Sequence, residues 1–220
     1  MPWITPATAI ALSLVLAALT PPLLSIIPLP PDEPDAVPYA QLASPRFQWV
    51  VAVASVAALG IALAATDPWL WGPWIGFGTG GVLLAVIDAR TGFLPLALTR
   101  ATWALVAGGV IVAALGRDDP GLLVTSIAGT LGAGGLFWGL WRLGGGLGFG
   151  DVRLAALIGT VTGATSLRLT AWSLLLGGLV GVAWGLAVAI HRKADGPFPY
   201  GPALVLGPFL AVGATTALSG

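Results

Sequence analysis

The chain has 220 residues, of which 57% are hydrophobic and only 8% are charged, and its formal net charge is zero. Soluble proteins carry about 25% charged residues, so the composition excludes an ordinary soluble domain, indicates a polytopic membrane protein and gives no sign of nucleic-acid binding. The lack of cysteine excludes disulfides and cysteine-bound zinc, and the single histidine, His191, argues against a multi-histidine metal site.

Eight apolar segments follow one another along the chain. A helix needs roughly 17–25 apolar residues to cross the core of a bilayer. The segments that reach or approach this length are Ala7–Ile27, Phe47–Ala65, Trp69–Ile87, Ala101–Leu115, Leu122–Trp141, Leu154–Ser166, Leu169–Ile190 and Ala203–Leu218. The sixth is short, and the sequence leaves open whether it spans fully. We predict an all-α fold: a single domain over residues 1–220 with about eight transmembrane helices.

Residues 28–46 form a proline-rich, acidic connection between the first two segments. This composition predicts an extended loop with little regular structure. Its acidic residues Asp32, Glu33 and Asp35 have two interpretations: a solvated connector, or a patch that steers a basic peptide toward the protein. The solvated connector is favoured, because salt screens individual surface charges.

The cationic residues predict an orientation in the membrane. Lys and Arg in short loops mark the cytoplasmic side. With the N-terminus outside and alternating crossings, the inner loops carry Arg46, Arg90, Arg100, Arg142, Arg153, Arg192 and Lys193, whereas the outer loops carry Arg117 and Arg168. The expected location is the inner (plasma) membrane, with these cationic loops in the cytoplasm.

Two aspartates stand at the edges of apolar segments. Asp88 ends the third segment and Asp151 precedes the sixth. Two crossings separate them, so both are expected on the inner face whether or not the sixth segment spans. Carboxyl groups that approach each other share one proton, so that one activates a water while the other polarises a carbonyl. This pairing is the chemistry of aspartic peptidases.

A purely structural interpretation stands beside this one. Aspartate at the start of a helix is often a cap, and glycines before it often form a turn, which fits Asp151. The same interpretation fits Asp88 less well, because a carboxylate at the C-terminal end of a helix is opposed by the helix dipole. In the functional interpretation, Gly148 and Gly150 permit positive φ and a close approach of an extended substrate to Asp151.

Three motifs resemble those of a known family. The sequence "GFGD", followed by Val-Arg, resembles the G-x-G-D signature of intramembrane aspartyl proteases. "VIDARTGFLPLALT" and "FPYGPALVLG" are similar to segments of the type IV prepilin peptidases within that group. The motif residues beside the two aspartates are Gly148, Phe149, Gly150, Arg153, Pro95, Pro199, Gly201 and Pro202.

The resemblance implies an aspartic endopeptidase, a hydrolase of type IV pilus assembly or protein secretion. Asp88 and Asp151 would be its catalytic residues, on cytoplasmic loops 88–100 and 142–153. The enzyme would remove a short basic leader from a prepilin or pseudopilin precursor at the cytoplasmic face of the bilayer, without a metal or cofactor. The sequence names no particular substrate and leaves the oligomeric state open.

The chain departs from the family pattern at three places. After Pro95 the family often has Asn or Asp, and Leu96 stands here. Arg153 stands where the family commonly has lysine. Larger relatives carry a cysteine-containing, zinc-binding insert where this chain has residues 28–46, so we expect a peptidase without N-methyltransferase activity. A small ion-coupled transporter and a catalytically inactive membrane scaffold remain as alternative functions.

Overall fold

The computed structural model describes residues 4–27, 38–144, 146–191 and 199–219, and all regular structure within these ranges is helical, which confirms the predicted all-α class. The acidic residues 32–35 and the Arg192–Lys193 pair lie outside the described residues. In chain order the elements are α1 (Ile4–Ile26), η1 (Tyr39–Leu42), α2 (Pro45–Ala65), η2 (Pro68–Leu70), α3 (Trp71–Gly76), η3 (Phe77–Gly81), α4 (Val82–Thr91), α5 (Leu96–Gly116), α6 (Gly121–Arg142), α7 (Phe149–Thr165), α8 (Leu167–His191) and α9 (Gly201–Ser219).

Six described helical spans are long and apolar enough to cross a membrane: Ala7–Ile26, Pro45–Ala65, Pro68–Thr91, Leu96–Gly116, Gly121–Arg142 and Leu167–Val188. By the length and composition of these helices, the chain is a multi-pass membrane protein. The helix α7 has 17 residues, and the apolar part of α9 is a shorter helix, Gly201–Thr215. Each of the eight predicted apolar segments is therefore helical, while six satisfy the length and composition expected of a crossing.

Local sequence explains where the helices begin and end. Ser44 caps α2 by accepting the Phe47 N–H at 3.3 Å, and Asp67 caps η2 by accepting the Trp69 N–H at 2.9 Å.

The third segment contains a feature that hydropathy did not predict. Its centre, the glycine-rich run Phe77–Gly81, winds as one turn of π-helix between α3 and α4, a geometry that usually appears as a single bulge.

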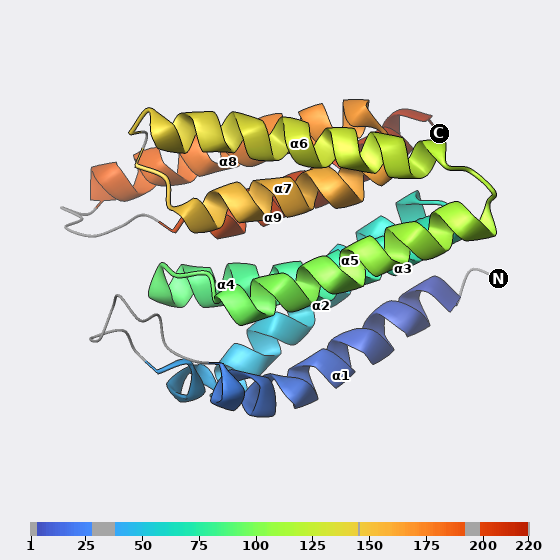
Figure 1. Cartoon of the computed structure of the whole chain (residues 1–220). Coiled ribbons are helices and arrows are strands. Elements are labelled where there is room, and N and C mark those ends of the chain that lie inside the picture. The colour runs from blue at the N-terminus through green and yellow to red at the C-terminus, as the bar shows by residue number, and fades with distance from the viewer. Residues whose placement is uncertain (1–3, 28–37, 145, 192–198, 220) are drawn as a thin grey trace.

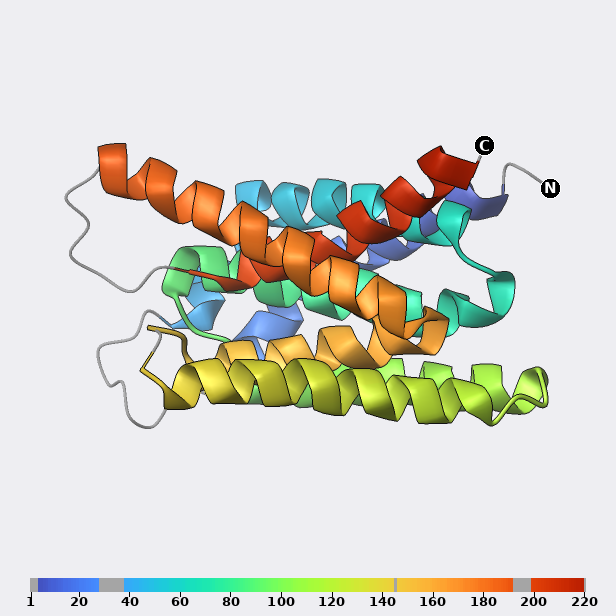
Figure 2. The ribbon, with the colours of Figure 1, turned by 90° about the horizontal axis from the view of Figure 1, so that it is seen from above.

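The long helices lie side by side along one direction, with α1 and α6 at opposite edges of the bundle in Figure 1. The C-terminal ends of α1, α4, α6 and α8 gather at one end, together with the N-terminal ends of α2, α5, α7 and α9 (Figures 1 and 2). We call this end the aspartate end, because the first turn of α7 and the last turns of α4 lie there.

The helix α7 forms the centre of the bundle. Between Leu154 and Ala164 every residue except Ala156 is buried, because α6, α5, α8 and α9 pack around it. The outward faces of the surrounding helices carry large exposed apolar side chains, such as Leu115 and Leu131. Exposed apolar surface of this kind marks a membrane or interaction surface. The buried α7 thus fixes the position of its first turn, which contains Asp151.

Candidate active site

Asp88 lies in α4 and is almost fully buried, with 4% of its surface exposed. Its Oδ2 accepts the backbone N–H of Gly201 at 2.9 Å. The helix ends at Gly92, whose φ of 70° is left-handed and whose N–H donates to the Asp88 carbonyl at 2.8 Å. The expected loop 88–100 was therefore too wide: only residues 92–95 separate the helices, because Gly92 ends α4 and Pro95 caps α5.

Gly201 is the residue that brings the start of α9 against Asp88. A Cβ atom on Gly201 would lie 2.7 Å from Asp88 Oδ2 and 3.0 Å from its Cγ, closer than real Cβ contacts. Only glycine can donate from this position without displacing the carboxyl group. Pro202 follows in the first turn of α9, and Pro199 lies partly buried two residues before Gly201.

Asp151 is the third residue of α7 and is also buried, with 8% of its surface exposed. Its Oδ2 accepts the Gly148 N–H at 2.9 Å, and its own N–H donates to the Gly148 carbonyl at 3.0 Å. This reciprocal pair is a capping arrangement. Asp151 therefore caps α7, as the structural interpretation predicted. The expected loop 142–153 was too wide, because α7 already begins at Phe149.

The two carboxyl groups are held in the same way. Each uses Oδ2 to accept one backbone N–H from a glycine, Gly201 for Asp88 and Gly148 for Asp151. Among the described residues, neither Oδ1 has a hydrogen-bond partner. The negative charge of Asp151 also acts on the Asp88 carboxyl, so the two groups lie within electrostatic range of each other. One oxygen of each carboxyl group is thus left for a water or a ligand.

The sequence predicted that the two glycines of "GFGD" adopt positive φ, and this prediction was wrong. Gly148 has extended backbone with φ of −77°, and Gly150 is helical. Among the described residues of this connection, Gly144 and Gly146 are left-handed. Close approach is nevertheless real at Gly150, where a Cβ would lie 3.0 Å from Leu94 Cδ1.

Leu94 was not among the sequence candidates, although it lies in the quoted Leu-Pro pair. Its side chain packs on Gly150 and so joins the α4–α5 connection to the first turn of α7. The adjacent Pro95 starts α5, and its carbonyl accepts both the N–H and the Oγ1 hydroxyl of Thr99 at 2.9 Å. Leu94 thus links the connection that follows Asp88 to the helical turn that carries Asp151.

Phe149 and Arg153 form a separate group on the rim of this site. The Arg153 guanidinium lies over the Phe149 ring, 4.8 Å from its centroid, and Trp141 contacts the same ring edge-on at 5.2 Å. The only ion pair between described residues joins Arg117 and Asp67, so Arg153 does not neutralise Asp151. Its contact is a cation–π interaction.

Tyr200 is a site residue that sequence reasoning missed, although it precedes Gly201 in the quoted motif. Its partly buried ring packs on Gly181 of α8. Burial, and then the charge of Asp151, raise the pKa of the Tyr200 hydroxyl above its usual value, so it remains a neutral donor. Asp151 lies outside the six candidate spans, and burial raises the pKa of its carboxyl while the Gly148 N–H opposes the rise.

No family model, curated protein or solved structure matches the chain. Within the described ranges, no three His, Cys, Asp or Glu side chains gather where they could hold a metal ion. The chemistry available to this site therefore rests on two buried carboxyl groups, the glycine donors that hold them and the phenol of Tyr200.

Proposed function

We propose that the chain is a polytopic aspartic endopeptidase of the prepilin peptidase type, with Asp88 and Asp151 as its catalytic pair. The observation that carries this proposal is the matched environment of the two carboxyl groups. Both are buried at one end of the bundle, both are held through Oδ2 by a glycine N–H, and both keep Oδ1 without a described partner. Purely structural caps have no need of two matched carboxyl groups at the same end of the bundle.

The chemistry follows from proton sharing. Buried carboxyl groups with interacting charges hold one proton between them. The ionised group takes a proton from a water, whose oxygen attacks the scissile carbonyl carbon, while the protonated group donates to the carbonyl oxygen. Collapse of the tetrahedral intermediate breaks the C–N bond, and a proton passes to the leaving amine. Water supplies every atom that the products gain, so no further reactant is required.

The same proposal assigns a topology. All eight predicted segments cross the inner membrane, with the aspartate end in the cytoplasm. The described arginines at the aspartate end are Arg46, Arg90, Arg100, Arg142 and Arg153, whereas Arg117 and Arg168 lie at the opposite end. This asymmetry supports the orientation. The substrate is a precursor with a short basic leader before an apolar helix, because the leader stays in the cytoplasm while the helix enters the bilayer.

The test is cleavage of a prepilin precursor by the membrane-embedded protein and by its variants Asp88→Asn and Asp151→Asn. Removing one acid–base group should lower the cleavage rate by about 100- to 10,000-fold. Asp67→Asn is the matched control, because Asp67 is an exposed aspartate at the opposite end of the bundle. It should cleave at the wild-type rate. Leader release is measured by gel shift and by mass spectrometry of the new N-terminus.

Two outcomes would contradict the proposal. Cleavage of a verified cognate precursor at equal rates by wild type and both site variants would make the aspartates structural. Flux of a small solute that depends on both aspartates, with no cleavage of any precursor, would assign the chain to the transporter class.

A further inference from the structure

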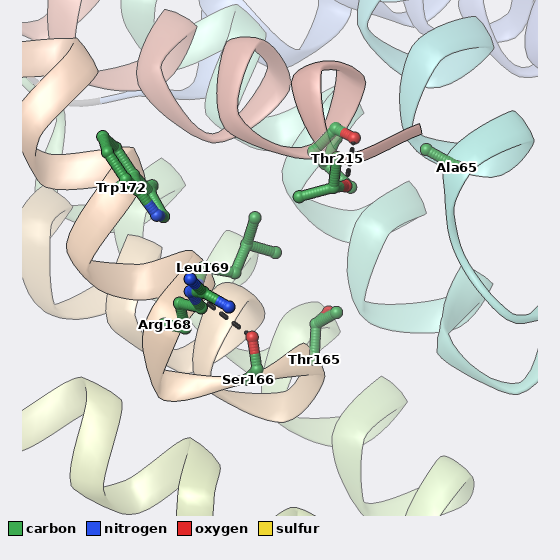
Figure 3. Close-up of a pocket in the computed structure, with 8 residues that line it drawn as sticks. Ala65, Thr165, Ser166, Arg168, Leu169, Trp172 and Thr215 are labelled. Carbon is green, nitrogen blue, oxygen red and sulfur yellow. Dashed lines mark hydrogen bonds between the residues drawn. The ribbon is translucent and has the colours of Figure 1, made fainter. Parts of the chain in front are cut away.

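A pocket lies at the end of the bundle opposite the aspartates. It has a volume of about 540 Å³ and is formed by Ala65 of α2, the α7–α8 turn and the C-terminal part of α9. Figure 3 shows that side chains from these three separate segments surround it. Its lining residues are Ala65, Thr165, Ser166, Arg168, Leu169, Trp172, Val212 and Thr215.

Arg168 gives this pocket an uncompensated positive charge. Its exposed guanidinium makes no hydrogen bond or ion pair with any described residue. The other arginine at this end, Arg117, is neutralised by Asp67 at 3.0 Å. No acidic residue lines the pocket. The cation of Arg168 is therefore free to meet an anion from outside the chain.

Two hydroxyl groups next to Arg168 add hydrogen-bond donors. Thr165 Oγ1 accepts the Trp74 Nε1–H at 3.3 Å, and Ser166 Oγ accepts the Leu169 N–H at 3.1 Å. Because both oxygens act as acceptors in these bonds, each hydroxyl keeps its own proton for another acceptor. A guanidinium beside two O–H donors is suited to a phosphate group.

Apart from Thr215, the rest of the wall is apolar. Ala65, Leu169 and Val212 line the pocket, and Trp172, with about half of its surface exposed, stands beside them. An inorganic ion gains no stabilisation from apolar side chains, whereas an acyl chain is stabilised by contact with them. Tryptophan near a helix end is also the residue that anchors a protein at the headgroup level of a bilayer.

We propose that this pocket binds an anionic phospholipid, with its phosphate on Arg168 and the two hydroxyls and its acyl chain along the apolar wall. An anionic headgroup such as phosphatidylglycerol is favoured over phosphatidylcholine, because no acidic residue of the pocket can receive a choline cation. This inference is independent of the peptidase proposal, since it concerns the opposite end of the bundle.

The test uses the purified full chain in detergent, titrated with phosphatidylglycerol or with phosphatidylcholine of the same acyl chains. Native mass spectrometry measures the fraction of protein that retains each lipid. We expect wild type to prefer phosphatidylglycerol and Arg168→Gln to bind it about fivefold more weakly, as loss of one cation near a lipid surface predicts. Arg168→Lys should keep most of the preference.

Arg117→Gln is the matched control, because it removes a cation at the same end of the bundle but outside the pocket, and it should bind phosphatidylglycerol as wild type does. Equal retention of both lipids by wild type would overturn the proposal, and so would an unchanged lipid preference in Arg168→Gln. Full displacement of phosphatidylglycerol by inorganic phosphate at the same concentration would assign the pocket to a free anion and would overturn the lipid assignment.

Discussion

Backbone donors, and not side chains, hold the two aspartates in place. The N–H groups come from Gly201, the first residue of α9, and from Gly148, the N-cap residue of α7. Such N–H groups have no partner inside their own helix, so they are available to a carboxylate without loss of a helical hydrogen bond. Their positions are as rigid as the helices themselves. The carboxyl groups are thereby oriented before any substrate arrives.

If Asp88 is catalytic as proposed, Gly201→Ala should impair cleavage without unfolding the protein. The new Cβ would lie 2.7 Å from Asp88 Oδ2, so either the carboxyl group or the start of α9 has to move. Displacement of a catalytic group by about 1 Å lowers a rate by on the order of a hundredfold. The measurement is the rate at which the folded, detergent-purified protein cleaves a precursor supplied at saturating concentration.

The control for this substitution is Gly139→Ala in α6. A Cβ at Gly139 would meet no atom within 4 Å, and alanine favours a helix over glycine by roughly 1 kcal/mol. Gly139→Ala should therefore cleave as wild type does. An unaltered rate in Gly201→Ala would show that the contact with Asp88 does not set the geometry of the reaction.

At the scale of elements, the position of Asp151 depends on how closely α7 packs on α6. Gly129 and Gly159 face each other across this contact, and a Cβ on either residue would overlap the carbonyl of the other. Hydroxyl groups strengthen the contact: Ser126 donates to the Thr160 carbonyl at 2.8 Å, and Thr130 and Thr160 share a hydrogen bond at 2.9 Å. Small residues and hydroxyl pairs of this kind hold helices together in membranes.

Gly159→Ala is predicted to destabilise the bundle. The added methyl group forces α6 and α7 apart, and overpacking of this type costs about 1–3 kcal/mol. The measurement is the thermal midpoint of the detergent-purified protein. Gly132→Ala, on the same helix as Gly129, is the control because a Cβ there meets no atom within 4 Å. A midpoint equally unchanged in both variants would mean that the two helices tolerate a wider separation.

At the scale of the whole molecule, the helix ends alternate between the two ends of the bundle (Figures 1 and 2). This alternation brings α4 and α7 to the same end, although α5 and α6 separate them along the chain. The helix α7 is not among the six helices that are long enough to cross a membrane. Other helices surround it on several sides. A helix shielded from lipid does not need the length of an isolated span, so a crossing by α7 remains part of the proposed topology.

The proposed crossing by α7 can be tested because the natural chain contains no cysteine. Leu143→Cys and Leu167→Cys place single thiols at exposed positions on either side of α7. If α7 crosses, a membrane-impermeant maleimide should label Leu143→Cys only in inverted vesicles and Leu167→Cys only in right-side-out vesicles. Detergent-solubilised protein should label fully at both sites. Labelling of both positions from one side would show that α7 does not cross.

The sequence by itself determined the class of the protein, the location of its helices and the pair of candidate aspartates. Hydropathy is a local property, so each of the eight apolar segments could be found without knowledge of the others. The common end of Asp88 and Asp151 followed from the two segments between them. The exact limits of the aspartate connections did not follow, because Gly92 and the capping bond of Asp151 extend the helices beyond the apolar runs.

Only the tertiary structure decided how the aspartates are held and which of two arginines at the opposite end, Arg117 or Arg168, is paired with Asp67. Gly201 reaches Asp88 across 113 positions of sequence, Leu94 packs on Gly150, and Asp67 neutralises Arg117 but not Arg168. Nothing in a linear pattern distinguishes these partners, because each contact depends on the angles and distances at which separate helices pack. Composition and hydropathy therefore fix where the helices form, while the packing of the bundle fixes which side chains meet.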